Sequence, residues 1–409
     1  MLKRTSLILL LALGGCNVEF SDNTNAANNG PVIQEKRDVA EFTEIDMTGP
    51  YDVVVTAEGG PALEIIGNEK LVKEVETVVT GNTLYIRSKS KTIIHLSTNF
   101  TPTQLTVKVA ASKLNRIKVN GSGDLVLDRF KGDKLELAIN GSGDVRANGT
   151  VGELQANING SGDMDVSQLQ VAKAHAQING SGNLKLGTVT EELQSQTNGS
   201  GDLDANNLKM AAVNTTIRGS GDVSITGDIK QFSAEINGSG DMEVRGLKAA
   251  GTKVRMGGSG SLTLDGTTTD LDVVVNGSGD FDASNLRSDK AQFTGHGTGN
   301  MRSNSVSDTL KIDLLGSGDL EASDIKTQQI EIVMDGTGSV ELSGQGKLLS
   351  AKLHGSGDLN ASSLLVERAK ISASGTGVAE VNVKQNATNG SSDSSNSRIV
   401  KVDKDGVVR

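Results

Sequence analysis

The sequence carries a Gly-Ser/Thr-Gly motif fourteen times, at spacings that alternate between 20 and 19 residues without exception. The first glycine of each copy lies at position 121, 141, 160, 180, 199, 219, 238, 258, 277, 297, 316, 336, 355 or 375. Fixed self-similarity at such a period indicates a solenoid, in which each repeat buries its apolar face only against its neighbours. The 409 residues are therefore not expected to form the two or three globular domains that length alone would suggest.

The residues on both sides of each motif alternate between apolar and polar. The second, fourth and sixth residues before the first glycine are mostly apolar, as in Leu135, Leu137 and Ile139. The fourth residue after it is apolar in all fourteen copies. A period of two indicates strands rather than helices. We predict an all-β fold, a parallel β-helix (β-solenoid) with about 19.5 residues per rung, because 13 intervals span 254 residues.

An antiparallel meander and a wider, four-stranded coil of 39 residues are the alternatives. The single-rung solenoid is favoured because identical corners stack directly and small aliphatic residues suit a narrow core. The 20-residue repeats place a large apolar residue nine positions after the first glycine, namely Phe130, Leu169, Leu208, Leu247, Leu286, Ile325 and Leu364. The 19-residue repeats often have a glycine nearby instead: Gly149, Gly187, Gly227, Gly266 or Gly344. We predict a second corner that alternates between an inserted apolar plug and a tight turn.

Composition excludes several classes of function. The net charge of -10 argues against nucleic acid as a partner, because neutralising phosphates requires a basic surface. One cysteine rules out a disulfide framework and a cysteine-based zinc site, and four scattered histidines offer little for a histidine-based metal centre. We therefore expect no cofactor and no metal site.

The N-terminus has the pattern of an export signal. Lys3 and Arg4 precede the apolar stretch 7–13, which is too short to span a bilayer of about 20 residues. The following Leu-Gly-Gly-Cys at 13–16 resembles a bacterial lipobox, with Cys16 as the lipid-bearing residue. Asn17, rather than Asp, follows the cysteine, and by the same resemblance this favours the outer membrane. We expect the membrane to be a partner through this N-terminal lipid, on the periplasmic or the cell-surface side.

The remaining sequence divides by composition. We predict a lipoprotein signal peptide at 1–15, a flexible tether at 16–32, irregular β rungs with a cap at 33–120, the repetitive solenoid at 121–384, and a polar linker with a C-terminal tail at 385–409. A cap is required because an open solenoid end exposes unpaired strand edges. Residues 71–79 fit a short helix or a strand equally well. The far end is closed either by residues 378–384 or by a hairpin of the tail.

The motif itself admits several interpretations. Its frequent form, Asn-Gly-Ser-Gly-Asp at 120–124, suits a tight bend in which Ser and Asp side chains bond to nearby backbone N–H groups. A ladder of aspartates could bind calcium, but each rung offers one carboxylate and Val378 and two serines interrupt the ladder. No Lys-Ser/Thr follows the glycines, which excludes a phosphate-binding loop. The repeated Asn-Gly-Ser glycosylation sequon is expected to be a by-product of turn chemistry.

Catalytic residues are not evident. The acidic residues recur at one repeat position, whereas cleavage of a glycosidic bond needs a pair of carboxyl groups that stands apart from the pattern. His175, His296 and His354 fall in different rungs, and the last two take the usual Asn position before the motif. Tyr51, Tyr85 and the few phenylalanines are too sparse to line a groove for stacking sugars. We expect no catalytic residues and no enzyme.

The chain from about residue 41 resembles the bacterial head GIN domain family, described as a putative auto-transporter adhesin head. The resemblance rests on the segments 42–45, 49–55, 63–67, 81–86, 105–109 and 114–117, which lead into the Gly-Ser-Gly-Asp run. It implies an exported, β-helical protein. The repeat array here is unusually long, and the sequence shows no membrane-barrel segment of its own.

These observations predict a non-catalytic, lipid-anchored β-solenoid of the cell envelope that acts in adhesion or as a scaffold. Its expected ligand is a cell-surface glycan or protein, bound through many weak contacts along a repetitive face. The alternative is a β-helix enzyme that binds or processes envelope polysaccharide.

Overall fold

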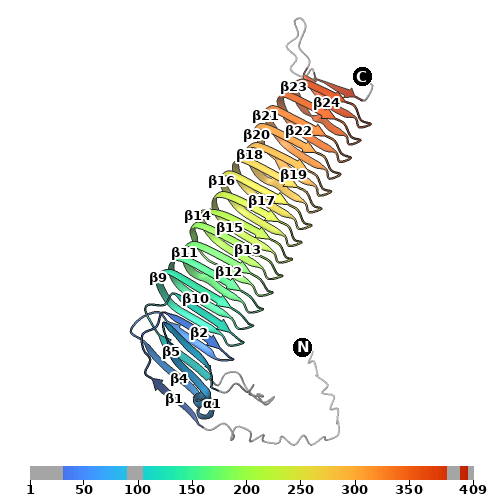
Figure 1. Cartoon of the computed structure of the whole chain (residues 1–409). Helices are drawn as coiled ribbons and strands as arrows, with labels where there is room; N and C mark the ends of the chain where they lie inside the picture. The colour runs from blue at the N-terminus through green and yellow to red at the C-terminus, as the bar shows by residue number, and fades with distance from the viewer. Residues whose placement is uncertain (1–30, 90–104, 385–396, 404–409) are drawn as a thin grey trace, which may run out of the picture.

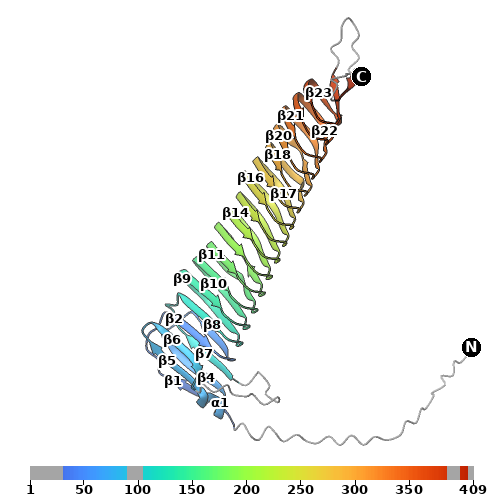
Figure 2. The same cartoon turned by 45° about the vertical axis from the view of Figure 1, so that its right-hand side comes forward.

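The computed structural model describes residues 31–89, 105–384 and 397–403, which form one elongated rod (Figure 1). The N-terminal strands form one end of the rod, and the repeat array runs from there to the other end. Figure 2 shows the rungs stacked regularly along the axis. The predicted signal peptide at 1–15, with Cys16, lies outside the described residues, as do most of the tether and most of the tail.

The array is built from strands that continue round a bend and pair with the strands of the rungs before and after. They are β9 (Leu125–Ile139), β10 (Val145–Ile158), β11 (Met164–Ile178), β12 (Leu184–Leu186), β13 (Val189–Thr197), β14 (Leu203–Ile217), β15 (Val223–Ile236), β16 (Met242–Met256), β17 (Leu262–Val275), β18 (Phe281–Gly295), β19 (Met301–Asn304), β20 (Val306–Leu314), β21 (Leu320–Met334), β22 (Val340–Leu353), β23 (Leu359–Ala373) and β24 (Ala379–Lys384).

The pairing within the array is parallel throughout, which confirms the predicted solenoid. Val145 of β10 pairs with Leu125 of β9 on one side and with Met164 of β11 on the other. These partners lie 20 and 19 residues away, so each rung is one repeat. The register therefore rules out both the antiparallel meander and the 39-residue coil.

The core is a continuous column of aliphatic side chains inside the rungs. In β9, for example, Leu125, Leu127, Leu135, Leu137 and Ile139 are each at most 1% exposed. Val126 and Glu136, which alternate with them, are partly exposed, as the period of two predicts. Full burial of one such side chain contributes about 2 kcal/mol, so the few inward residues of a rung stabilise it only when neighbouring rungs cover them.

Each rung has two corners: the motif corner at Gly-Ser/Thr-Gly, and the plug corner about nine residues later. All seven predicted plugs, from Phe130 to Leu364, are at most 2% exposed. In the 19-residue rung, Gly149 lies opposite Phe130 with φ of +129°, and a Cβ there would lie 2.1 Å from the Phe130 carbonyl oxygen. Gly227, Gly266 and Gly344 have similar positive φ values, whereas Gly187 does not. The alternation of plug and tight turn is thus confirmed at these positions.

The N-terminal part supplies eight strands and one helix. They are β1 (Val32–Arg37), β2 (Glu44–Thr48), β3 (Asp52–Thr56), β4 (Ala62–Asn68), α1 (Glu69–Glu74), β5 (Val75–Thr80), β6 (Thr83–Ser88), β7 (Leu105–Ala110) and β8 (Arg116–Asn120). One sheet runs in the order β5-β6-β2-β8-β9 and the other in the order β1-β4-β7-β3-β9. Strands β2 and β3 therefore form a rung that lies between later segments of the chain.

This inserted rung contains a corner that lacks the Gly-Ser/Thr-Gly motif. Gly49 lies directly beneath Gly121, with Gly49 N–H donating to Asn120 O at 3.2 Å and Gly123 N–H donating to Gly49 O at 3.1 Å. Gly49-Pro50-Tyr51-Asp52 thus occupies the place of Gly-Ser-Gly-Asp in the stack. It is the first corner of the solenoid, with Tyr51 where the array has a second glycine.

Both ends of the described solenoid carry antiparallel strands. At the N-terminal end, β1 pairs with β4 and β5 pairs with β6, and the Arg37 guanidinium donates to Val72 O and Val75 O at 2.9 and 2.7 Å. Residues 71–79, which fit a helix or a strand, contain the C-terminal part of α1, whose N-terminus is capped by the Asn68 side chain, and then most of β5. At the far end, β25 (Ser397–Val402) pairs with β24, so a strand of each predicted closing segment takes part.

Candidate binding face

The motif corner is fixed by close backbone stacking. The Ser181 N–H donates to Gly160 O of the preceding rung at 2.9 Å, and equivalent bonds recur along the array. A Cβ on Gly180 would lie 1.9 Å from that same Gly160 oxygen. Only glycine fits at such a distance, so the repetition of the motif reflects packing of one rung on the next.

The aspartate ladder has a structural role. The Asp241 Oδ1 accepts a hydrogen bond from the Ser261 N–H of the next rung at 2.8 Å, and Asn183 accepts one from Asp202 N–H in the same way. The acceptor thus serves the following rung, not its own turn. Within the described ranges, no three His, Cys, Asp or Glu side chains come together as a group that could hold a metal ion.

The asparagines before the motif also form a ladder. Asn140 Nδ2 donates to Asn120 Oδ1 at 2.8 Å, and the pattern continues through Asn159 and Asn179 to Asn198 at 2.6–3.0 Å. These side chains, which form the formal glycosylation sequons, are therefore bonded to one another along the rod.

The remaining candidate residues are not brought together. His175 lies within β11, whereas His296 and His354 lie at motif corners farther along the rod. Tyr51 is 8% exposed, and Phe130, Phe232, Phe281 and Phe293 are at most 1% exposed. No described phenylalanine therefore offers an open ring on which a sugar could stack.

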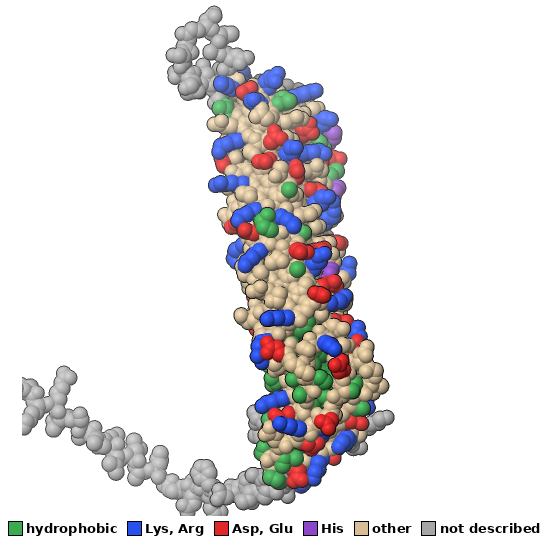
Figure 3. Space-filling model, turned by 90° about the vertical axis from the view of Figure 1, so that its left-hand side faces the viewer, with side chains coloured by type: hydrophobic (Ala, Val, Ile, Leu, Met, Phe, Trp, Pro, Cys, Tyr) green, Lys and Arg blue, Asp and Glu red, His purple; other side chains and the backbone are tan. Residues whose placement is uncertain are grey.

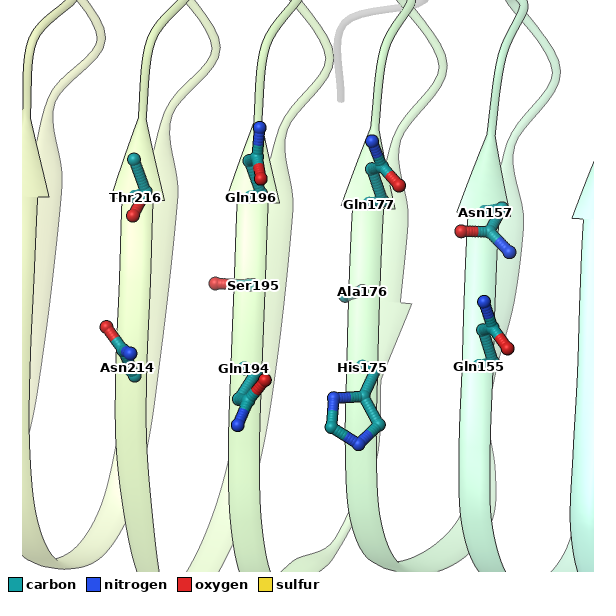
Figure 4. A pocket seen from close by; sticks show the side chains of 10 residues that line it. All are labelled: Gln155, Asn157, His175, Ala176, Gln177, Gln194, Ser195, Gln196, Asn214 and Thr216. Atoms are coloured by element: carbon teal, nitrogen blue, oxygen red, sulfur yellow. The ribbon is translucent and has the colours of Figure 1, made fainter.

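A concentration of side-chain amides lies on the outer surface of β10, β11, β13 and β14. We call it the amide face, and it comprises Gln155, Asn157, Asn159, His175, Gln177, Asn179, Gln194, Gln196, Asn198, Asn214 and Thr216. Figure 4 shows two of its rows: Gln155, His175, Gln194 and Asn214 in one, and Asn157, Gln177, Gln196 and Thr216 in the other. Eight residues of the amide face, together with Ala176 and Ser195, line a shallow groove of about 310 Å³.

The strand period places these side chains at the surface. Beneath them, Ala156, Ala176 and Ser195 point inward, and Ser195 shares a buried hydrogen bond of 2.6 Å with Thr215. The alternation between inward and outward residues therefore presents one row of amides every second residue. Within one row, the side chains come from neighbouring strands, which lie about 4.8 Å apart.

Several of these amides have no hydrogen-bond partner among the residues that the structure describes. The side chains of Gln155, Asn157 and Asn214 form no hydrogen bond with any described residue, although each is exposed or half-buried. In contrast, Gln196 donates to Asn198 at 2.8 Å and Gln194 donates to Glu192 at 2.6 Å. A primary amide carries two donors and an acceptor, so the unpartnered ones are available to a ligand.

The two rows in Figure 4 carry no Lys, Arg, Asp or Glu, although the exposed Arg218 lies at their edge, and the same sheet is charged on either side. Toward the N-terminus, Arg116 and Glu136 form an ion pair of 2.9 Å. Toward the C-terminus, Lys253 and Arg255 face outward from β16. These two rows therefore form an uncharged strip that breaks the surface pattern of the rod, and ligand sites in a repeat protein are expected at such breaks.

The sequence matches one family along most of its length. The profile described as "Putative auto-transporter adhesin, head GIN domain" matches residues 41–167, 150–230, 226–323 and 296–401. The chain belongs to the head GIN domain family. The four overlapping matches show that this GIN protein repeats the family's rungs in tandem, which accounts for the length of the rod. No curated protein matches the chain.

Solved structures resemble this GIN protein at low identity. A "putative adhesin" from Parabacteroides distasonis is 22% identical, with 67% of this chain and 96% of that chain covered and a TM-score of 0.44. A "putative adhesin" from Parabacteroides merdae is 21% identical, with 67% and 97% covered and a TM-score of 0.40. A "putative lipid binding protein" from Parabacteroides distasonis is 17% identical, with 85% and 96% covered and a TM-score of 0.31. These similarities give no information about the ligand of this GIN protein.

The amide face was not among the sequence-predicted sites. Its signal was present at the third and fifth residues before the motifs at 160, 180, 199 and 219, where six of the eight residues are Gln or Asn. The signal is visible only when outward residues are compared from rung to rung at equal register. The predicted lipid-bearing residue, Cys16, lies outside the described residues. No helix in the described ranges is long and apolar enough to cross a bilayer.

Proposed function

We propose that this protein is a non-catalytic adhesion rod of the cell envelope that binds a neutral, hydroxyl-rich glycan through the amide face. The observation that carries the proposal is the set of amides Gln155, Asn157 and Asn214, which have no hydrogen-bond partner among the described residues and lie in two rows without charged side chains. Sugar hydroxyls both donate and accept hydrogen bonds, as primary amides do. The family's description as an adhesin supports a role in attachment at the cell envelope.

Binding without turnover follows from the chemistry of the face. Hydrolysis of a glycosidic bond generally uses two carboxyl groups flanking the bond. The amide face offers no carboxylate, and its one titratable side chain is His175. Single amide–hydroxyl contacts are weak, so affinity arises when an extended ligand engages several rungs together.

Attachment to the membrane is part of the proposal. A lipid on Cys16 holds the rod to the outer membrane. Replacing Cys16 with serine is expected to move the protein from the membrane fraction to the soluble fraction, as measured by immunoblot after fractionation. Protease treatment of intact cells then distinguishes display on the cell surface from a periplasmic position.

The binding experiment uses the triple variant Gln155→Ala, Asn157→Ala and Asn214→Ala. The variant and the native protein are incubated with immobilised mannan, xylan and β-glucan, and the bound fraction is measured. Binding of the native protein to at least one glycan, and a loss of at least about tenfold in the variant, is expected because several contacts act together. The variant should keep its melting temperature, because the three side chains form no hydrogen bonds within the described protein.

The matched control is Ser233→Ala, Gln292→Ala and Thr294→Ala, which changes outward positions of β15 and β18 in the same columns. It should bind as the native protein does. Equal binding by all three proteins contradicts the proposal, and release of reducing ends from any glycan identifies an enzyme instead. Target cells give a further test: periodate should abolish attachment, whereas loss only after protease treatment indicates a protein ligand.

A further inference from the structure

A row of cationic side chains follows the plug corner on a different side of the rungs from the amide face. It occupies the tenth position after the first glycine of the 20-residue rungs. We call it the cation file, and it comprises Lys131, Lys209, Lys248, Arg287 and Lys326. All five residues are exposed. Figure 3 shows Lys and Arg side chains at intervals along the length of the rod, with Asp and Glu side chains and uncharged surface between them.

The register places these cations on alternate rungs. Thr267 lies between Lys248 and Arg287, pairing with both, and Thr150 lies in the same way between Lys131 and Gln170. Two rungs span about 10 Å, so the four consecutive cations from Lys209 to Lys326 extend over about 30 Å. The 19/20 alternation thus imposes a period of two rungs on the surface chemistry of this corner.

Hydroxyl groups line the space between the cations. A shallow groove of about 590 Å³ includes Lys248 and Arg287, and its other polar lining residues are Thr267, Thr268, Thr269, Ser288, Asp289, Ser305 and Ser307. The one carboxylate among them, on Asp289, accepts a hydrogen bond from Ser307 at 2.8 Å. The groove therefore alternates point charges with neutral donors and acceptors.

The cations have no packing role that would explain their recurrence. The same outward position is filled by Gln170 and Leu365 in the other two 20-residue rungs. Lys248 pairs with Asp228 at 2.6 Å and Lys326 with Asp324 at 2.9 Å, but their side chains remain 62% and 69% exposed. Lys209 and Arg287 form no ion pair with any described residue. Such exposed pairs contribute little to stability and are readily exchanged for a ligand anion.

One break in the backbone adds an apolar contact. Between Lys209 and Ala211 the register of β14 shifts, and Met210 has φ of +57° and is 55% exposed. In other 20-residue rungs the equivalent residue, such as Ala249, is buried. Met210 therefore presents a flexible apolar side chain beside a cation, where the C–H face of a sugar ring can pack.

We propose that the cation file binds a linear acidic polysaccharide that carries one carboxylate or sulfate on every second sugar. In such a polymer a charged sugar alternates with a neutral one, as a cationic rung alternates here with a rung that carries no cation at this position. Thr267 lies between Lys248 and Arg287. Asp228 is the register partner of Lys209 and forms an ion pair with Lys248. Nucleic acid fits less well, because duplex DNA carries one charge per about 1.7 Å and the protein's net charge is -10. An anionic membrane attracts clustered basic residues rather than a single spaced file.

The experiment measures binding to hyaluronan, in which every second sugar carries a carboxylate. Three other polymers serve as comparison ligands: polygalacturonate, in which every sugar is charged, neutral dextran, and single-stranded DNA. The file variant replaces Lys209, Lys248, Arg287 and Lys326 with serine. The control variant replaces four exposed cations elsewhere, Lys185, Lys253, Arg255 and Arg302, with serine and so has the same net charge.

We expect the native protein and the control variant to bind hyaluronan and the file variant to bind at least tenfold more weakly. Affinity for hyaluronan oligosaccharides should rise with each disaccharide up to about four, the number of consecutive cations, and polygalacturonate should bind no more tightly. Equal losses in both variants, a preference that follows only ligand charge density, or tighter binding of DNA would each overturn the proposal. The amide-face variant should bind hyaluronan normally, so the two proposals fail or stand separately.

Discussion

At the motif corner all fourteen rungs carry the same glycines, whereas at the plug corner the rungs alternate and their outward residues vary. The difference follows from how the rungs approach each other. Backbones at the motif corner leave no space for a Cβ, as at Gly180. At the plug corner, an inward apolar residue satisfies the packing, and the next side chain points to solvent. The first corner therefore maintains the shape of the rod, while chemistry that can vary is confined to the second corner and to the outer faces of the strands.

The largest effect is expected from Gly180→Ala at the motif corner. The added methyl group would lie 1.9 Å from the Gly160 oxygen, which forces two rungs apart and breaks their stacked hydrogen bonds. We expect a loss of about 4 kcal/mol in the free energy of unfolding, or failure to fold. Chemical denaturation followed by circular dichroism measures it. The control is Gly251→Ala, where no atom lies within 4 Å of the added group, and its effect should stay within about 0.5 kcal/mol. Similar losses in both variants would contradict the comparison.

The plug corner gives the next largest effect, through its inward residue alone. Leu169 is fully buried, so Leu169→Ala should leave a cavity and cost about 3 kcal/mol. Met210→Ala, at a 55% exposed position of the same corner, should change stability by less than about 0.5 kcal/mol. The free energies of unfolding of the two variants measure the difference. A costly Met210→Ala would mean that the outward side of this corner is not free to vary.

These two corners also show what the sequence could predict. The period of two and the motif spacing were sufficient for the solenoid, its inward residues and the plugs, because each depends on local alternation repeated many times. The corner at Gly49 was missed because Pro50 and Tyr51 replace the small residues, and its rung is inserted out of chain order. The amide face was missed because it depends on outward residues of adjacent rungs, which lie 19 or 20 residues apart and must be compared at equal register. Contacts between side chains of adjacent rungs can be identified only when the register of the strands is known.

The aspartate ladder tests whether the motif corner needs a metal ion. Asp241→Ala removes the acceptor for Ser261 N–H and should cost about 1 kcal/mol. Asp241→Asn should be nearly neutral, because Asn183 and Asn300 accept the equivalent bond elsewhere in the ladder. Thermal melting with and without a chelator should give the same midpoint for the native protein. A chelator-sensitive midpoint, or an Asn variant as unstable as the Ala variant, would restore the calcium hypothesis.

The smallest effect is expected from pH at the bend that leads into the plug corner. Asp165 Oδ1 accepts a hydrogen bond from Ser167 N–H at 3.0 Å, and its bonds to Ser167 lower the pKa of this carboxyl below its usual value despite partial burial. A carboxyl whose pKa is lower in the folded state stabilises the fold above its unfolded pKa, and this contribution disappears as the pH falls through the folded pKa. Asp165→Asn should therefore melt slightly below the native protein at pH 6, and the difference should shrink on acidification below pH of about 4. The effect is small because solvent screens a carboxylate that is only partly buried. Melting curves of both proteins across this range measure it, and a difference that persists unchanged in acid would show that the charge of Asp165 does not hold the bend.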